Sequence, residues 1–208
     1  LMIAEDNDGD FPVFFPLWGP GGYAGGHMWP AFVAEYVDNE RLRFCPKATA
    51  SLSQVTEMKY GAWTQLDTIS PPPSYKPLGS YGLNEYVATY WFDPDPEQEW
   101  PLRFWGTPQI TQAAQVPMLG GCMWAGSFPD SDDTPPAVEN DIGLGGNQTS
   151  RFCIDRHDCG IINMVFMDGH VRAVGLKELW LLKWHRLWPE DNPLPEWPVW
   201  MQKFKDPR

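Results

Sequence analysis

The sequence predicts an α+β fold in which an antiparallel sheet is followed by a late amphipathic helix. Apolar runs at 161–166 and 171–174 flank the pair Asp168-Gly169, as in a β-hairpin. From Leu176 the spacing of the apolar residues changes from that of a strand to that of a helix. The segments with strand character are grouped rather than alternating with helices, and this favours antiparallel pairing.

Length and composition indicate one loop-rich domain. The 208 residues can bury a sizeable core, and 43% of them are hydrophobic. The 12 Trp and 22 Pro predict a mostly β body whose thin core is filled by large aromatic side chains. The formal net charge of −12 argues against nucleic acid or an anionic membrane surface as a partner, because both attract basic proteins. No segment has the pattern of a transmembrane span or a signal peptide.

The first ten residues have the pattern of a helix end. Segment 1–10 begins within a helical pattern that breaks at Asp8-Gly9. We therefore expect the last turns of a helix that starts upstream, followed by a single globular domain over 11–208. The other expected elements are a loop over 11–26, a short helix over 29–37 with Pro30 at its first position, an extended arm over 41–46, strands over 80–87 and 116–124, an acidic loop over 93–99, and an exposed excursion over 128–146.

The hairpin and the helix after it have the clearest patterns. A type I′ turn needs positive φ at both central residues, and Asp168-Gly169 suits this requirement. The helix presents one apolar face and ends before Pro189, because proline cannot continue a helix. Its apolar positions are Leu176, Leu179, Trp180, Trp184 and Leu187.

The cysteines allow three interpretations. Two disulfides in an oxidising compartment are one, with Cys153 paired to Cys159 and Cys45 paired to Cys122. A zinc site is the second, although the gap between Cys153 and Cys159 differs from the two-residue gap of zinc knuckles. Free thiols are the third. The zinc site would use Cys153, His157, Cys159 and His170.

Two acidic clusters are candidate calcium sites. The run from Asp6 through Asp8 to Asp10 resembles the opening of an EF-hand loop, but Phe11 stands where that loop needs glycine. Solvated acids at a helix break are the alternative interpretation. The second cluster lies in the predicted excursion and consists of Asp130, Asp132, Asp133 and Asp141. Neither spacing is diagnostic of calcium.

Titratable residues also gather around the hairpin. A hydrolase would use His157 as a base and Asp168 to orient it, but no nucleophile elbow accompanies them. We therefore expect no catalytic residues and interpret Asp168 as a residue that shapes the turn through backbone hydrogen bonds. The other members of the group are Asp155, Asp158 and His170.

Aromatic residues near the acidic loop are candidate ligand contacts. Exposed Trp faces stack on sugar rings, so Trp91, Trp100 and Trp105 would suit a secreted glycan- or ligand-binding module. Burial in the core or in a subunit interface is the alternative for these residues. Later tryptophans with amphipathic spacing are expected in the core, namely Trp180, Trp184, Trp197 and Trp200.

Several segments together resemble a known bacterial family. The matching pieces are AEDNDGDFP at 4–12, FCP at 44–46, SYGLN at 80–84, VPMLGGCMW at 116–124, and a long tail with RFCIDRH at 151–157, INMVFMDGHVRAVGLKELWLLKWHR at 162–186 and WPVWMQKFKD at 197–206. With these pieces the chain resembles the prepilin-type, type II secretion pseudopilin-like proteins of planctomycetes and related bacteria. Those proteins carry a C-terminal H-x(9)-D-G processing-associated motif.

The chain departs from the family pattern at three points. The motif histidine and aspartate are separated by ten residues instead of nine, which puts a one-residue insertion near Cys159-Gly160. Glycines at 120–121 stand where relatives commonly carry an acid. The leader and hydrophobic first helix of the family are not in this sequence. The residues that match the motif are His157, Asp168 and Gly169.

The resemblance implies a pilin-like head, with an antiparallel sheet packed on the end of an N-terminal helix. It implies a non-enzymatic structural subunit of a type IV pilin-like or type II secretion pseudopilus filament. Such a subunit assembles with copies of itself and with other pilin-like subunits. It contacts the inner membrane only through the upstream helix, and its head lies in the periplasm, at the cell surface or outside the cell. Pseudopilins often bind calcium in a late loop, so the resemblance favours Ca²⁺ at the second acidic cluster.

Overall fold

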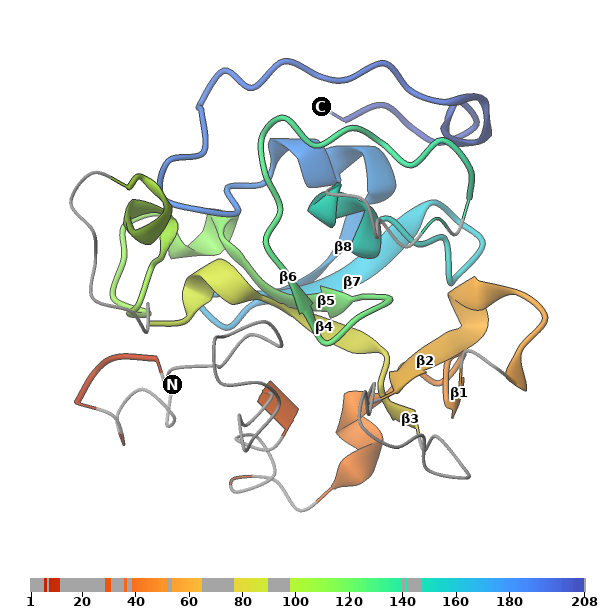
Figure 1. Cartoon of the computed structure of the whole chain (residues 1–208), viewed down its shortest axis with the longest axis horizontal. Helices are drawn as coiled ribbons and strands as arrows, with labels where there is room; N and C mark the ends of the chain where they lie inside the picture. Colours follow the sequence, from red (N-terminus) through yellow and green to blue (C-terminus); the bar gives the residue numbers. More distant parts are fainter. Residues whose placement is uncertain are drawn as a thin grey trace.

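A computed structural model describes residues 6, 8–11, 29–30, 36, 39–51, 54–64, 77–89, 98–139, 141 and 147–207. This part of the chain is α+β, with two sheets and short helices (Figure 1). The strands are β1 (Ala50–Ser51), β2 (Gly61–Thr64), β3 (Pro77–Gly79), β4 (Tyr81–Asn84), β5 (Pro117–Gly121), β6 (Gly126–Ser127), β7 (Ile161–Phe166) and β8 (Val171–Gly175). The 3-10 helices are η1 (Glu40–Arg43), η3 (Met58–Tyr60), η4 (Glu85–Val87), η5 (Trp100–Arg103), η6 (Ala113–Gln115), η7 (Gln148–Arg151), η8 (Leu176–Leu181) and η9 (Val199–Met201).

The larger sheet has five strands in the order β6-β4-β5-β7-β8. The pairs β4–β5, β5–β7 and β7–β8 are antiparallel, and only β6 joins its neighbour β4 in parallel. The antiparallel sheet and the strands predicted over 80–87 and 116–124 are therefore confirmed, with the first strand ending in η4.

The smaller sheet was not predicted. It has the order β1-β2-β3, with a parallel pair β1–β2 and an antiparallel pair β2–β3. β3 leads almost directly into β4, so the two sheets are continuous along the chain (Figure 1). Strands β1 to β3 have two to four residues each, and such short strands give little local sequence signal.

The predicted hairpin is confirmed, but its turn differs from type I′. Only Gly169 has positive φ, at 88°. Its N–H donates to the Phe166 carbonyl at 2.9 Å, and the Phe166 N–H donates to the His170 carbonyl at 3.0 Å. Asp168 accepts a hydrogen bond from the His170 backbone N–H at 3.1 Å, so it shapes the turn as predicted.

The predicted late helix is wrong in length and type. The chain forms the 3-10 helix η8 and becomes extended at Leu182, where ψ is 145°. Beyond that point the backbone bonds to other segments, because the Lys183 N–H donates to the Gln115 carbonyl and the Arg186 N–H to the Arg103 carbonyl. Tertiary hydrogen bonds thus replace the helical ones. Four of the five predicted apolar positions are buried, namely Leu176, Leu179, Trp180 and Trp184, whereas Leu187 beyond η8 is exposed.

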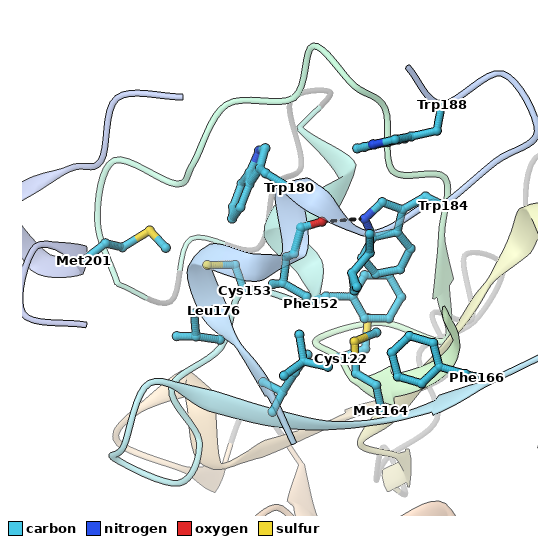
Figure 2. Packing of buried hydrophobic residues seen from close by; sticks show 14 residues of the cluster. Cys122, Phe152, Cys153, Met164, Phe166, Leu176, Trp180, Trp184, Trp188 and Met201 are labelled. Carbon is cyan, nitrogen blue, oxygen red and sulfur yellow. Dashed lines mark hydrogen bonds between the residues drawn. The ribbon is translucent and has the colours of Figure 1, made fainter. Parts of the chain in front are cut away.

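The main core lies between the larger sheet and the C-terminal third of the chain (Figure 2). At its centre Phe152 and Trp184 pack with ring centroids 4.8 Å apart, and the Trp184 indole donates to the Leu179 carbonyl at 2.7 Å. A second cluster forms around Trp63, Leu83 and Val116. The main core comprises Cys122, Phe152, Cys153, Ile162, Met164, Phe166, Val174, Leu176, Leu179, Trp180, Leu182, Trp184, Trp188 and Met201.

The start of the chain contacts the loop that follows η5. The break predicted at Asp8-Gly9 is present, with φ of 57° and 95°, but the described residues around it form turns rather than a helix. Phe11 donates its N–H to the Gly106 carbonyl at 2.7 Å. Residues 1–5 and 7 lie outside the described residues, as does most of the helix predicted over 29–37, of which Trp29, Pro30 and Tyr36 are described and helical. Among the described helices, none has the length and hydropathy needed to span a membrane.

The segment predicted as an exposed excursion is packed onto the core over 128–139. The Trp180 indole donates to the Asp133 carbonyl at 2.7 Å, and the Trp200 indole donates to the Pro136 carbonyl at 2.8 Å. Two indole groups from the C-terminal segment therefore fix this loop, although its composition suggested solvent exposure.

Gly160 offers a test of the contact between the start of β7 and the C-terminal tail. Both Gly160 (φ 69°) and Gly169 (φ 88°) are left-handed, but a Cβ on Gly160 would overlap the Phe204 ring, whereas Gly169 has open space around it. We expect Gly169→Ala to lower the free energy of unfolding by about 1 kcal/mol. Gly160→Ala should cost about 1–3 kcal/mol more because it adds overpacking. Urea unfolding of the two variants measures the difference, and equal losses would contradict the packing.

Candidate functional site

Residues 155–160, which we call the hub turn, contact more separate segments than any other short stretch described above. The Asp155 carboxylate accepts hydrogen bonds from the N–H groups of Cys159 (2.9 Å) and Gly160 (2.8 Å). Positive φ at Asp158 (56°) and Gly160 (69°) tightens the turn. Three consecutive side chains, at 156–158, then reach different parts of the protein.

Arg156 connects the two sheets. Its side chain is 2% exposed and donates to the carbonyls of Lys59 (2.7 Å) and Gly61 (3.4 Å) beside the smaller sheet. It also donates to the carbonyls of Ser80 (2.7 Å) and Cys122 (3.3 Å), which flank β4 and β5. Burial lowers the pKa of this guanidinium, but arginine stays protonated in proteins. A charged donor with several N–H groups therefore binds four backbone carbonyls, of which that of Ser80 also accepts the Cys122 N–H at 3.0 Å.

Asp158 binds the segments that precede β2. It lies 2.6 Å from Lys59 Nζ and 3.4 Å from Lys47 Nζ, and it accepts a hydrogen bond from the Tyr60 hydroxyl at 2.9 Å. The hydrogen bonds from Lys59 and Tyr60 lower the pKa of Asp158 to about 2. The same contact with Asp158 raises the pKa of Lys59. Because Asp158 is about half exposed, these ion pairs position the segments more than they stabilise the fold.

His157 contacts a cysteine from a distant part of the chain. Its Nε2 lies 3.5 Å from Cys45 Sγ, and the two residues line a pocket of about 10 Å³ together with Arg156. Cys45 is held from the other side, because its N–H donates to Ser80 Oγ at 2.6 Å. Cys45 is 2% exposed, whereas His157 is partly exposed. The pair combines a nucleophile and a base, an arrangement that the sequence did not indicate.

The structure does not contain the disulfides that the sequence suggested. Cys45, Cys122, Cys153 and Cys159 are all free thiols. Cys153 lies in the main core while Cys159 is exposed, and Cys45 faces His157. Cys122 accepts a hydrogen bond from the Trp124 N–H at 3.4 Å. Burial raises the pKa of Cys122 to about 12 and raises that of Cys153 as well.

The zinc and hydrolase interpretations are not supported by the geometry. Asp168 pairs with His170, whose Nδ1 lies 2.6 Å from its carboxylate, and not with His157. The His170 ring stacks on Phe166 at 4.5 Å. The zinc candidates are therefore dispersed, and the described residues hold no group of three or more His, Cys, Asp or Glu suited to a metal ion.

Three of the calcium candidates, Asp6, Asp130 and Asp133, bind protein groups. Asp130 pairs with Arg103 and accepts the Ser131 N–H, and Asp133 accepts hydrogen bonds from the N–H (2.7 Å) and hydroxyl (2.8 Å) of Thr149. Burial opposes ionisation of Asp130, but the neighbouring His185 and Arg103 outweigh it and lower the pKa. Asp132 is exposed. At the other end of the chain, Asp6 accepts a hydrogen bond from Tyr36, and Asp8 and Asp10 are exposed.

The candidate ligand-binding tryptophans contribute to packing. Trp100 is 36% exposed and packs against Tyr86 and Phe128 with tilted rings 5.4 Å and 5.2 Å away. The Trp105 indole donates to the Trp184 carbonyl at 3.1 Å. Trp105 is partly exposed, and Trp91 lies outside the described residues.

A groove of about 610 Å³ lies beside β8, the edge strand of the larger sheet. Its walls combine apolar groups such as Leu181 with the ion pair Arg172–Glu178 at 2.6 Å. Asp206 also lines the groove and pairs with the buried Lys177 at 2.6 Å. The Gly175 N–H points away from β7 and toward Glu178 Oε2 at 3.4 Å. The backbone groups of alternate β8 residues therefore point to the open edge of the sheet.

Glu85 is a further titratable group that the sequence did not single out. It begins η4 and lies against Gly126, where any side chain would overlap it. Burial raises its pKa to about 7, although Arg151 acts in the opposite direction. No local motif marks this position, because the shift depends on the contact between β4 and β6.

Sequence reasoning also missed Arg156 and the contact between Cys45 and His157. A signal for Arg156 existed, since a basic residue between Ile154 and the motif histidine stands in an otherwise apolar and acidic stretch. The contact with Cys45 spans 112 residues and leaves no local signal.

No protein-family model, curated protein or solved structure matches the chain.

Replacement of Arg156 tests its role as a connection between the sheets. Arg156→Met removes the guanidinium donor from four carbonyls and should lower the free energy of unfolding by at least about 3 kcal/mol. Arg156→Lys should also destabilise, because an ammonium group cannot reproduce the planar fork. Urea unfolding measures both, with the exposed Arg186→Met as the matched control. A midpoint for Arg156→Met equal to that of the control would contradict this role.

Glu85 predicts a specific pH dependence of stability. Its folded-state pKa of about 7 lies above the ordinary value of 4.5, so the native state binds more protons than the unfolded state between these pH values. The free energy of unfolding should therefore fall as pH rises through this window and then level off. Glu85→Gln should equal wild type at pH 4 and exceed it by up to about 3 kcal/mol at pH 8. Parallel pH profiles for wild type and variant would refute this, and the exposed Glu190→Gln is the control.

Proposed function

We propose that the chain is the head of a non-enzymatic structural subunit that assembles into a type IV pilin-like or type II secretion pseudopilus filament. Its partners are copies of itself and other pilin-like subunits. Its head lies in the periplasm or at the cell surface, and a hydrophobic helix upstream of the head supplies the contact with the inner membrane. Two of its four free thiols, Cys122 and Cys153, are buried in the main core, where burial protects thiols in an oxidising compartment.

The observation that carries this proposal is the placement of the family motif. His157 directly precedes β7 in the hub turn, and Asp168-Gly169 follows β7 in the hairpin turn. The motif thus spans β7 together with the turn on each side of it, from His157 to Gly169. The extra residue relative to the family pattern falls in the hub turn, where positive φ at Asp158 and Gly160 accommodates it. A motif that defines a strand and its turns favours a structural role over a catalytic one.

The open edge of β8 is the surface that we assign to assembly. Within the described residues β8 pairs only with β7, and Val171 and Ala173 on it are exposed, Val171 to 64%. An exposed edge with free backbone groups is a template for strand addition. Contacts between two different surfaces of identical subunits generate open filaments instead of closed dimers.

Charge distribution supports contact between different surfaces. Segment 170–208 contains seven Lys and Arg against five Asp and Glu, whereas 1–169 contains eight against 22. The C-terminal segment, which includes β8 and the groove, therefore has a net charge of +2, and the rest of the chain has −14. Copies that join β8 to the acidic part of a neighbour bring opposite charges together.

Assembly of the protein expressed from its complete reading frame tests the proposal. The reading frame should encode a short basic leader and about 20 apolar residues before the head, and the protein should sediment as filaments. Val171→Lys should reduce the filament fraction by at least about tenfold, because a charge on the edge blocks strand addition. The control Val199→Lys changes a residue that is 83% exposed but lies in η9, and it should assemble normally. An upstream sequence with an ordinary cleaved signal peptide, or a wild-type protein that stays monomeric, would contradict the proposal.

A further inference from the structure

Cys45 and His157 form a pair that is fixed from both sides. Cys45 follows η1 and is held by Ser80, whose own N–H donates to the Arg43 carbonyl at 2.9 Å. His157 is held between Arg156 and Asp158, both of which are anchored to other segments. The 3.5 Å separation of Cys45 Sγ and His157 Nε2 is therefore a property of the fold, and it places an imidazole where it can take the thiol proton.

A buried positive charge lies close to the pair. None of the four hydrogen-bond acceptors of Arg156 described above is a carboxylate, because all four are backbone carbonyls. Negative charge on Cys45, Cys122 or Tyr81 would stabilise this guanidinium. Of the two thiols, only Cys45 also contacts a histidine. A thiolate that forms at Cys45 would thus have an imidazolium and a buried guanidinium among its neighbours.

Access to the sulfur is limited to small molecules. The pocket that Cys45 lines has a volume of about 10 Å³, close to that of a single water molecule. The partly exposed His157 and the exposed Asn163 form its outer wall. The other thiols differ, since Cys122 and Cys153 are buried in the main core and Cys159 is exposed.

We propose that Cys45 is a nucleophilic thiol that reacts with hydrogen peroxide, with His157 as its base. His157 Nε2 takes the thiol proton, and the sulfur attacks one peroxide oxygen. The S–O bond forms as the O–O bond breaks, and the leaving oxygen takes the proton from His157 and departs as water. The sulfur loses two electrons and becomes a sulfenic acid, and the peroxide is reduced. This modification site is independent of the filament role.

The experiment compares the four thiols within one protein. Wild-type protein is treated with hydrogen peroxide at a few equivalents, and catalase then removes the remaining peroxide. The protein is unfolded in urea that contains dimedone, so that each sulfenic acid is trapped whatever its burial in the native state, and peptide mass spectrometry gives the labelling rate of each cysteine. We expect Cys45 to be labelled at least about tenfold faster than Cys159, and Cys122 and Cys153 to stay unlabelled. A bulky maleimide should show the reverse preference, with Cys159 modified first. Labelling of Cys45 no faster than that of Cys122 would overturn the proposal without any variant.

The role of His157 needs a separate readout. His157→Gln should slow the labelling of Cys45 by at least about tenfold, because the base is lost, and should leave the rate at Cys159 unchanged. If the variant unfolds, Cys122 and Cys153 become labelled as well. In that case the pH profile of the wild-type labelling rates decides whether His157 is the base. Protonation of the base would stop it from taking the thiol proton, so the ratio of the Cys45 rate to the Cys159 rate should fall as the pH is lowered. An unchanged Cys45 rate in folded His157→Gln, or a ratio independent of pH, would exclude His157 as the base.

Discussion

The buried guanidinium of Arg156 is the interaction on which the rest of the structure depends. Burial of a charge is costly unless its hydrogen bonds are satisfied, and here four carbonyls from the edges of both sheets satisfy them. These hydrogen bonds therefore couple three features, namely the hub turn, the contact between the two sheets and the approach of the segment that carries Cys45. Asp158 extends the same connection to the exposed Lys47 and the buried Lys59.

This coupling also explains how the long tail of the sequence, residues 151–206, contributes to the fold. The hub turn begins β7, the Asp168-Gly169 turn ends it, and β8 with η8 then covers the main core with Trp180 and Trp184. The same arrangement leaves β8 as an open edge and sets His157 beside Cys45. The same segment thus positions both proposed sites. The hub turn at its start holds His157 beside Cys45, and β8 at its end forms the proposed assembly surface.

The features that were predictable from the sequence depend on local contacts. The hairpin, the strands around 81–84 and 117–121, and the burial of Trp180 and Trp184 follow from apolar spacing and one Asp-Gly pair, whereas Trp197 and Trp200 are only partly buried. The late helix failed because carbonyls from distant loops bind its backbone. The disulfides failed because Cys45 contacts His157, while Cys153 lies in the main core and Cys159 is exposed. The smaller sheet, the Arg156 contacts and the Cys45–His157 pair join segments far apart in the chain, so no local pattern encodes them.

Native-state hydrogen exchange tests most directly whether Arg156 joins the two sheets into one cooperative unit. Backbone amides of β2 that pair with β1 and β3 belong to a small sheet that could open alone. If Arg156 couples the sheets, these amides should exchange with nearly the same opening free energy as those of β5 and β7, and both groups should respond equally to low urea. Exchange of the β2 amides through a separate, low-energy opening while β5 and β7 stay protected would contradict the coupling.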